Sequence, residues 1–95
     1  MSMIGSPTPE SRIVAVAGVL SAEVDGEAVL LHGGTYFGLN AVAARVWFLL
    51  GEGKSLGSLC ETLQSEFDVP AEVLWDDVVK LIGEMSTSGL VVDAA

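Results

Sequence analysis

Two glycine-containing turns determine how the first half of this chain can fold. Asp25-Gly26 separates the segments LSAEV and EAVLLH, and Gly33-Gly34 separates EAVLLH from TYFGL. Asp-Gly and Gly-Gly between valine-rich segments are typical of tight β-hairpins, because glycine tolerates the backbone dihedrals that such turns need. The stretch from Arg12 to Leu39 therefore predicts three antiparallel strands in chain order, with the last strand, Thr35–Leu39, at one edge.

The second half of the sequence has the period of α-helices. Apolar residues recur at helical spacing in residues 41–50, 56–67 and 70–88. Asn40 and Ser55 precede the first two segments and are suitable N-caps, since their side-chain oxygens can accept from free N–H groups of the first turn. Pro70 suits the first turn of the third helix, and Gly89 suits the left-handed residue beyond its end. The closing LVVD is predicted to be a short extended segment.

These elements predict one fold class. Three short strands cannot bury both faces of a sheet, so helices must cover one face. We therefore expect an α+β, winged-helix-like fold, in which a three-stranded antiparallel β-meander is followed by three α-helices. Residues 1–11 contain two prolines and little periodicity, which indicates a flexible N-terminal tail, and residues 12–95 are predicted to be a single domain.

The charge of the chain limits its partners. The chain has four basic and 13 acidic residues, which gives a formal net charge of −9. This charge repels a phosphate backbone, so a winged-helix DNA-binding regulator is disfavoured and no nucleic-acid partner is expected. No apolar run approaches the roughly 20 residues that span a membrane. The N-terminus also lacks the basic and apolar regions of a signal peptide, so we expect a cytoplasmic protein without a membrane partner.

Few residues have side chains suited to catalysis. Cys60 is the single cysteine and lies in the apolar stripe of the second predicted helix, where an inert buried thiol is favoured over a nucleophile. His32 is the single histidine and is interpreted as a surface or turn residue. One Cys and one His do not supply the four ligands of a structural zinc site, and no glycine-rich nucleotide loop is present. We therefore predict a protein that is not an enzyme and that needs no cofactor or metal.

Binding of a peptide or protein remains, and the predicted edge strand is the first candidate surface. Between Gly33 and Leu39 the sequence has no proline and no charge, although natural edge strands are usually blunted by such residues. An uncharged edge can accept an extended peptide as an additional strand. Alternatively, the chain's own tail or a second copy covers this edge, which would make the chain a homodimerisation module. The candidate peptide-binding residues on the strand are Thr35, Tyr36, Phe37 and Gly38.

The third predicted helix offers a second candidate surface. At about 100° per residue, four apolar residues form its core stripe: Leu74, Val78, Leu81 and Met85. Three more extend that stripe into a flank wider than a surface helix needs: Trp75, Val79 and Ile82. Either the strands and the first helix cover this flank, or an apolar ligand side chain does. Nearby carboxylates suit a lysine or arginine on such a ligand: Asp76, Asp77 and Glu84. The candidate binding residues on this helix are Trp75, Asp76, Val79 and Ile82.

An ordered set of motifs resembles a known family. The sequence contains G-x-Y-x-x-L-N, then V-W-x-L-L, then S-L-x-x-L-x-x-x-L, then D-V-x-x-L-I-x-x-M-x-x-x-G-L-V, over residues 25–92. This order resembles the coenzyme PQQ synthesis protein D family, also known as the RiPP precursor recognition element (RiPPs are ribosomally synthesised, post-translationally modified peptides). The form of the second motif that contains Trp47 is most similar to the stand-alone B-type recognition proteins of lasso peptide pathways.

The resemblance implies a fold of three strands and three helices, and a function. Members bind the N-terminal leader of a precursor peptide antiparallel to the third strand, here Thr35–Leu39, and against the third helix, here residues 75–82. They then present the precursor to a leader protease and an ATP-dependent cyclase in lasso pathways, or to a radical enzyme in quinone-cofactor pathways. The family has no catalytic motif to transfer. We expect Leu39 and Trp47 to lie in the core, where they support the site.

Overall fold

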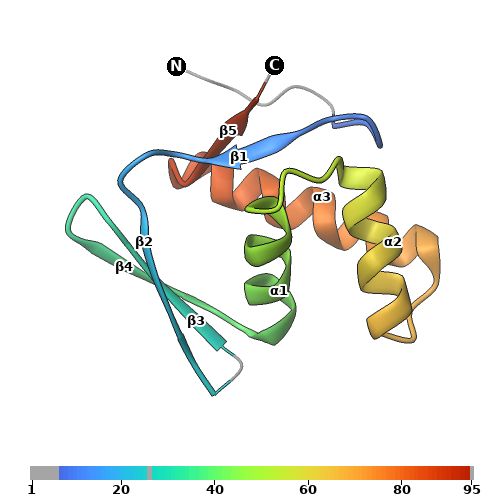
Figure 1. The fold of residues 1–95 in the computed structure, drawn as a ribbon, viewed down its shortest axis with the longest axis horizontal. Helices are drawn as coiled ribbons and strands as arrows, with labels where there is room; N and C mark the ends of the chain where they lie inside the picture. The colour runs from blue at the N-terminus through green and yellow to red at the C-terminus, as the bar shows by residue number, and fades with distance from the viewer. Residues whose placement is uncertain (1–6, 26, 95) are drawn as a thin grey trace.

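A computed structural model describes residues 7–25 and 27–94 of the chain. The elements in this part are β1 (Ile13–Ala15), β2 (Leu20–Val24), β3 (Glu27–His32), β4 (Thr35–Leu39), α1 (Ala41–Leu50), α2 (Leu56–Glu66), α3 (Ala71–Thr87) and β5 (Val91–Asp93). Strands β2, β3 and β4 form an antiparallel sheet in that order, and the helices lie to one side of it (Figure 1). The predicted α+β class, the β-meander and the three helices are confirmed.

The hairpin turns form for the reason that the sequence indicates. Gly33 and Gly34 have φ values of 58° and 80°, which is the pair of positive dihedrals that a type I′ turn requires. Asp25 also has a positive φ, 52°, at the first position of the other turn, whereas Gly26 lies outside the described residues. A type I′ turn matches the twist of its strands, so the Gly33-Gly34 turn fixes the register between β3 and β4.

Strands β1 and β5 form a separate two-stranded sheet that the sequence analysis did not predict. Ile13 pairs with Asp93 and Ala15 with Val91, and β1 and β5 lie side by side near the two chain ends (Figure 1). The pairing continues through a hydrogen bond from the Val16 N–H to the Leu90 carbonyl at 2.8 Å. The valine-rich segment from Arg12 was read as part of the meander. It leaves the meander because Gly18, at a φ of 92°, turns the chain before β2.

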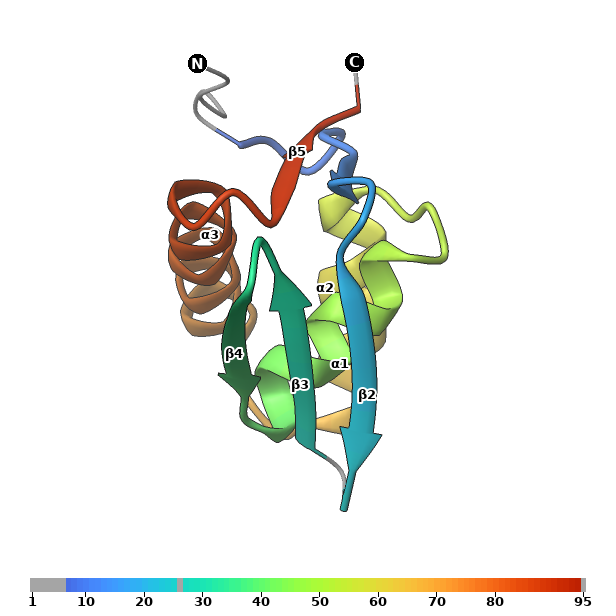
Figure 2. The same cartoon turned by 90° about the vertical axis from the view of Figure 1, so that its left-hand side faces the viewer.

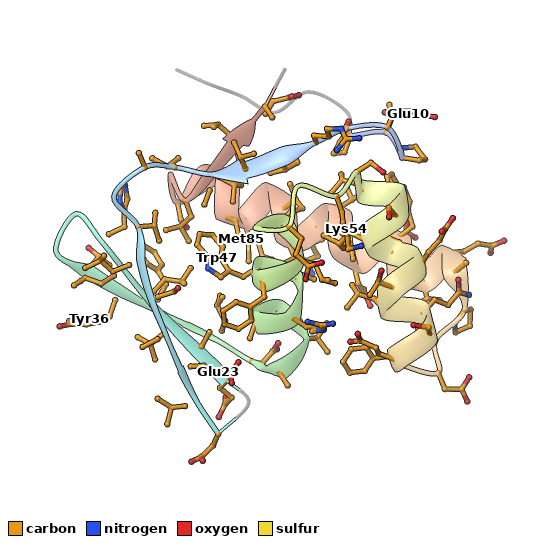
Figure 3. The ribbon with its side chains drawn as sticks, in the orientation of Figure 1. Glu10, Glu23, Tyr36, Trp47, Lys54 and Met85 are labelled. Atoms are coloured by element: carbon orange, nitrogen blue, oxygen red, sulfur yellow. The ribbon has the colours of Figure 1, made fainter. Side chains whose placement is uncertain are left out.

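The core lies between the inner face of the sheet and the helices. Ala28 and Leu30 on β3 are almost completely buried, as are most of the inward-facing residues of α1. Leu39 and Trp47 are each 8% exposed, so the prediction that both belong to the core is confirmed. Figure 3 shows Trp47 on the inner side of α1, directed toward the sheet. The end of β4 and the start of α1 are therefore held rigidly by packing.

The predicted helix ends agree with the structure in most details. The Ala43 N–H donates to Oδ1 of Asn40 at 2.9 Å, and the Ser58 N–H donates to Oγ of Ser55 at 3.3 Å, so both N-caps are confirmed. Pro70 occupies the cap position before α3 rather than its first turn. Gly89 has a φ of 77°, and the Leu90 N–H bonds to the Met85 carbonyl, as in a Schellman-type helix end.

The N-terminal segment approaches the start of α2. Carbonyls of Ser11 and Pro9 accept hydrogen bonds from the first N–H groups of α2, those of Leu56 at 2.9 Å and Gly57 at 2.8 Å. A Cβ at Gly57 would lie 3.0 Å from the Pro9 Cβ and 3.1 Å from the Pro9 carbonyl oxygen, so a larger residue would be crowded here. Residues 9 and 11 of the predicted flexible tail are thus hydrogen bonded to the domain, whereas residues 1–6 of that tail lie outside the described residues.

An ion pair between α1 and α2 leads to a first prediction. The guanidinium of Arg45 donates to both carboxylate oxygens of Glu66, at 2.8 and 2.7 Å. These hydrogen bonds hold the pKa of Glu66 below its usual value of 4.5, so the carboxylate stabilises the fold above that pH and this contribution is lost as the pH falls. We expect Glu66→Gln to lower the free energy of unfolding slightly at pH 7, and the difference from the parent to vanish at acidic pH.

Urea denaturation at a series of pH values measures this effect. Glu61→Gln is the matched control, because Glu61 lies on the same helix and has no ion pair with a described residue. If both variants differ from the parent by the same amount at every pH, the Arg45–Glu66 pair contributes nothing specific to stability.

Candidate functional site

The free edge of β4 presents a defined set of backbone groups. In an antiparallel ladder, hydrogen-bonded and non-hydrogen-bonded pairs alternate, and the pair that flanks a two-residue turn is hydrogen bonded. His32 and Thr35 flank the turn, so Thr35, Phe37 and Leu39 direct their N–H and C=O groups toward β3. Tyr36 and Gly38 therefore direct theirs outward. No other described strand pairs with this edge.

A groove separates this edge from α3. Figure 2 shows β4 as the strand of the sheet that lies beside α3. One wall is formed by residues 36–40, and the floor includes Ala43 and Leu90. The other wall is formed by one side of α3: Asp77, Lys80, Leu81, Glu84, Met85 and Ser88. The two hollows that make up the groove share Asn40 and Leu81, so they are continuous; we call this surface the β4–α3 groove.

The helix side of this groove differs from the flank that the sequence analysis selected. Trp75, Asp76 and Val79 do not line the groove, and Ile82 is completely buried. Leu81, which was assigned to the core stripe, is only half-buried and lies in the groove wall. The core stripe of α3 is rotated toward Ile82, and the elements that pack most closely on this helix are α2 and β5. Binding by Trp75, Asp76, Val79 and Ile82 is therefore not supported by their positions.

The strand candidates lie where the sequence analysis expected them. Tyr36, Phe37 and Gly38 line the groove, and Thr35 begins β4 opposite His32. Phe37 is half-buried, with its backbone groups paired to Leu30. The Tyr36 side chain is 72% exposed and projects away from the helices (Figure 3). Contact of these residues with a peptide remains a prediction, and the outward backbone of Tyr36 and Gly38 is the part of the strand best placed to make it.

Met85, Ala43, Leu90 and Ser88 also belong to the groove, and the sequence analysis did not identify them as site residues. Met85 and Leu90 are almost completely buried, so they form an apolar floor rather than an exposed patch. The predicted core position of Met85 is confirmed, whereas Leu90 was predicted only as part of an extended segment. Only the position of β4 beside the last turns of α3 shows that this part of the core borders a groove.

The outer face of the sheet is a second exposed apolar surface. Four of its residues are large and exposed: Leu20, Val24, Val29 and Tyr36. They belong to the rows that point away from buried Ala28 and Leu30, because side chains alternate along each strand. Tyr36 belongs to this face through its side chain and to the β4–α3 groove through its backbone. The outer face is therefore continuous with the free edge of β4.

The residues considered for catalysis lie apart from the groove. Cys60 is half-buried on α2 and packs against the core, and its burial raises the pKa of the thiol, so the neutral form is favoured. His32 lies at the end of β3. Within the described residues, no three His, Cys, Asp or Glu side chains are grouped closely enough to hold a metal ion. Nor does any helix of that part have the length and apolarity that crossing a membrane requires.

A second prediction concerns the cysteine. Cys60→Ala removes a side chain of modest size that packs beside the core, so the free energy of unfolding should fall by about 1 kcal/mol or less. Peptide binding should be unchanged, because Cys60 does not line the β4–α3 groove. Chemical denaturation and a binding titration measure the two effects. Loss of peptide processing by a folded Cys60→Ala protein would contradict the assignment of Cys60 as a packing residue.

The fold and the groove together define a class of protein. This is a small winged-helix-like domain whose sheet has an uncovered edge beside a groove, which is the arrangement of a domain that binds a peptide by strand addition. A family model for coenzyme PQQ synthesis protein D (PqqD) matches residues 27–91. The chain belongs to the PqqD family, and its resemblance to that family is confirmed.

Two solved structures are similar to most of this chain. One, titled "TbiB1 in Complex with the TbiA(beta) Leader Peptide", is 35% identical with a TM-score of 0.79, over 82% of this chain and 93% of that one. The other, titled "Lasso peptide synthetase B1 complexed with the leader peptide", is 26% identical with a TM-score of 0.78, over 85% of this chain and 98% of that one. A search of curated proteins gave no significant match.

Proposed function

We propose that this protein is a non-catalytic recognition domain that binds the leader of a ribosomally synthesised precursor peptide and presents the precursor to maturation enzymes. The leader adds a strand to the sheet along β4 and packs its inward side chains into the β4–α3 groove. The observation that carries this proposal is the uncovered edge at Tyr36 and Gly38, which faces the groove. Membership of the PqqD family and the likeness to two leader-peptide complexes support it.

The dimensions of the groove fit a short extended segment. From Asp77 to Ser88, α3 rises by roughly 16 Å at 1.5 Å per residue, which corresponds to about five residues of a strand. The edge contributes backbone hydrogen bonds, which depend little on sequence, and the groove contributes the preference for particular side chains. Affinity therefore comes mainly from β4 and selectivity mainly from α3.

The partner enzymes are a further part of the proposal. Likeness to lasso peptide B1 proteins favours a leader protease and an ATP-dependent cyclase as the enzymes that receive the precursor. A radical enzyme of a quinone-cofactor pathway is the alternative, because the matched family is named after coenzyme PQQ synthesis. A DNA-binding role has no support from a chain of net charge −9. The cytoplasmic location predicted from the sequence belongs to this proposal as well.

The direct experiment uses the full chain and a synthetic peptide with the leader segment of the precursor gene that neighbours the gene for this chain. Amide hydrogen exchange should show new protection at Tyr36 and Gly38 when the peptide is added, because their outward N–H groups become paired. Fluorescence anisotropy of the labelled peptide should give saturable binding. Protection confined to β2, or an absence of binding, would contradict the proposal.

A third prediction tests presentation separately from binding. If a maturation enzyme contacts the outer face of the sheet, Leu20→Asp should slow leader removal by the protease from the same gene cluster by about tenfold, since a buried charge in an interface costs at least ~1.4 kcal/mol. Leader affinity should be unchanged, because Leu20 is on β2, away from the groove. Ser21→Asp is the matched control, as Ser21 faces the opposite way on the same strand. Equal rates for both variants would contradict this use of the outer face.

A further inference from the structure

The β4–α3 groove has an acidic end. Asp77 lies at this end, and Glu84 follows two helical turns later, about 10 Å along the axis and beyond Leu81, on nearly the same side of α3. Neither carboxylate forms an ion pair with a described residue. Lys80 is the one cation in the described groove wall, so the α3 wall as a whole has two negative charges and one positive charge. Both carboxylates are exposed to solvent and available to a ligand.

The apolar part of the groove lies next to the acidic end. Leu81 and Phe37 are half-buried on opposite walls, and Met85 forms the floor between them. Asp77 precedes Leu81 by one helical turn, an axial distance of about 6 Å. Successive residues on the same side of a strand are about 6.7 Å apart. Neighbouring inward side chains of a bound peptide would therefore match the spacing between the Leu81 and Asp77 positions.

The orientation of the peptide decides the order of these two side chains. Residues 36–40 face the C-terminal part of α3, and Asn40 with Val42 faces Asp77, so β4 and α3 run in opposite directions along the groove. A peptide antiparallel to β4 runs from the Asp77 end toward the Ser88 end. It pairs through Tyr36 and Gly38, so every second residue points at α3. The residue at the acidic end then comes two positions before the residue at Leu81.

We infer that the β4–α3 groove selects a leader segment of the form basic–x–apolar, in which a lysine or arginine meets Asp77 and the apolar side chain packs between Leu81 and Phe37. This inference rests on the proposed leader binding and names the chemistry of the leader. A second copy of this chain is a poor occupant, because a chain of net charge −9 repels itself.

The test is an affinity matrix between peptides and protein variants. An alanine scan of the neighbouring-gene leader first identifies its apolar anchor, as the position whose truncation costs most affinity. Three peptides then carry lysine, glutamine or glutamate two positions before that anchor. They are titrated against the parent, Asp77→Lys and Asp76→Lys. Asp76 is the matched control, because it is exposed on the same helix, adjacent to Asp77, and does not line the groove.

The parent should bind the lysine peptide about two- to fivefold more tightly than the glutamine peptide, the range for an exposed ion pair, and the glutamate peptide most weakly. Asp77→Lys should reverse this order, and Asp76→Lys should keep it. If the three peptides have the same order of affinity for both variants, the charge preference comes from the general field of the protein. That result would contradict the inference but not the proposed leader binding. If no leader peptide binds the parent, the proposed function itself falls.

Discussion

Gly38→Pro should weaken leader binding by about tenfold or more, a loss of ~1.4 kcal/mol. Proline removes the outward N–H of residue 38 and places its ring where the backbone of a paired peptide would lie. The sheet should survive the change, because this N–H does not bond to β3 and proline is tolerated at such edge positions. Fluorescence anisotropy with the labelled leader measures the affinity, and chemical denaturation checks the fold.

The other edge of the same sheet provides a matched control. The pair Val24–Glu27 flanks the β2–β3 turn, so the backbone groups of Ser21 and Glu23 point outward from β2 in the same way. Glu23→Pro also deletes an outward N–H, from an edge that does not border the β4–α3 groove. It should leave leader affinity within about twofold of the parent. Equal losses for the two variants would mean that proline acts by disturbing the sheet, and the docking edge would be unproven.

The register between β3 and β4 also shows which substitution on β4 would be a poor test of leader binding. Phe37→Pro appears to test the same edge, but the N–H of Phe37 is directed at Leu30 on β3. Removing it would break a hydrogen bond of the β-meander and disturb the half-buried Phe37 ring as well. Loss of binding by that variant would report a damaged fold. The residues of the edge are therefore not equivalent, although the sequence alone presents them as one uncharged run.

The sequence was sufficient for the fold where local signals determine the structure. Turn glycines have positive φ values, Asn40 and Ser55 cap their helices, and helical spacing marks the helices, because each feature depends on residues close together in the chain. Pairing of β1 with β5 depends on residues from opposite ends of the chain. Valine-rich composition predicts an extended segment for β1 but contains no information about its partner.

The candidate site also has one side that local sequence signals predict and one side that they do not. An uncovered edge at β4 follows from a three-strand meander, so the strand residues were predictable from turns and composition. The helix side was not, because α3 has apolar residues on both margins of its core stripe and the helical period cannot show which margin another element covers. In the structure Ile82 turns inward and Leu81 borders the groove, so the groove lies along the opposite margin of α3 from Trp75.

Truncating the two margins of α3 should separate these alternatives. Leu81→Ala removes the apolar wall that faces Phe37, so leader affinity should fall by about five- to tenfold. This is ~1–1.4 kcal/mol, less than the ~1.5–3 kcal/mol for burying a whole leucine side chain, because Leu81 is already half-buried without the leader. Trp75→Ala removes a larger side chain that packs against the core outside the groove. It should cost more free energy of unfolding than Leu81→Ala and leave leader affinity unchanged.

Calorimetric titration of the two variants with the same leader peptide, at a temperature where both are folded, gives the comparison. The comparison decides which margin of α3 contacts the leader. We expect Leu81→Ala to have the larger effect on binding and Trp75→Ala to have the larger effect on stability. If Trp75→Ala weakens binding and Leu81→Ala does not, the leader packs on the margin that the helical wheel first indicated. The peptide would then have to leave the edge of β4, because Trp75 does not line the groove beside that edge.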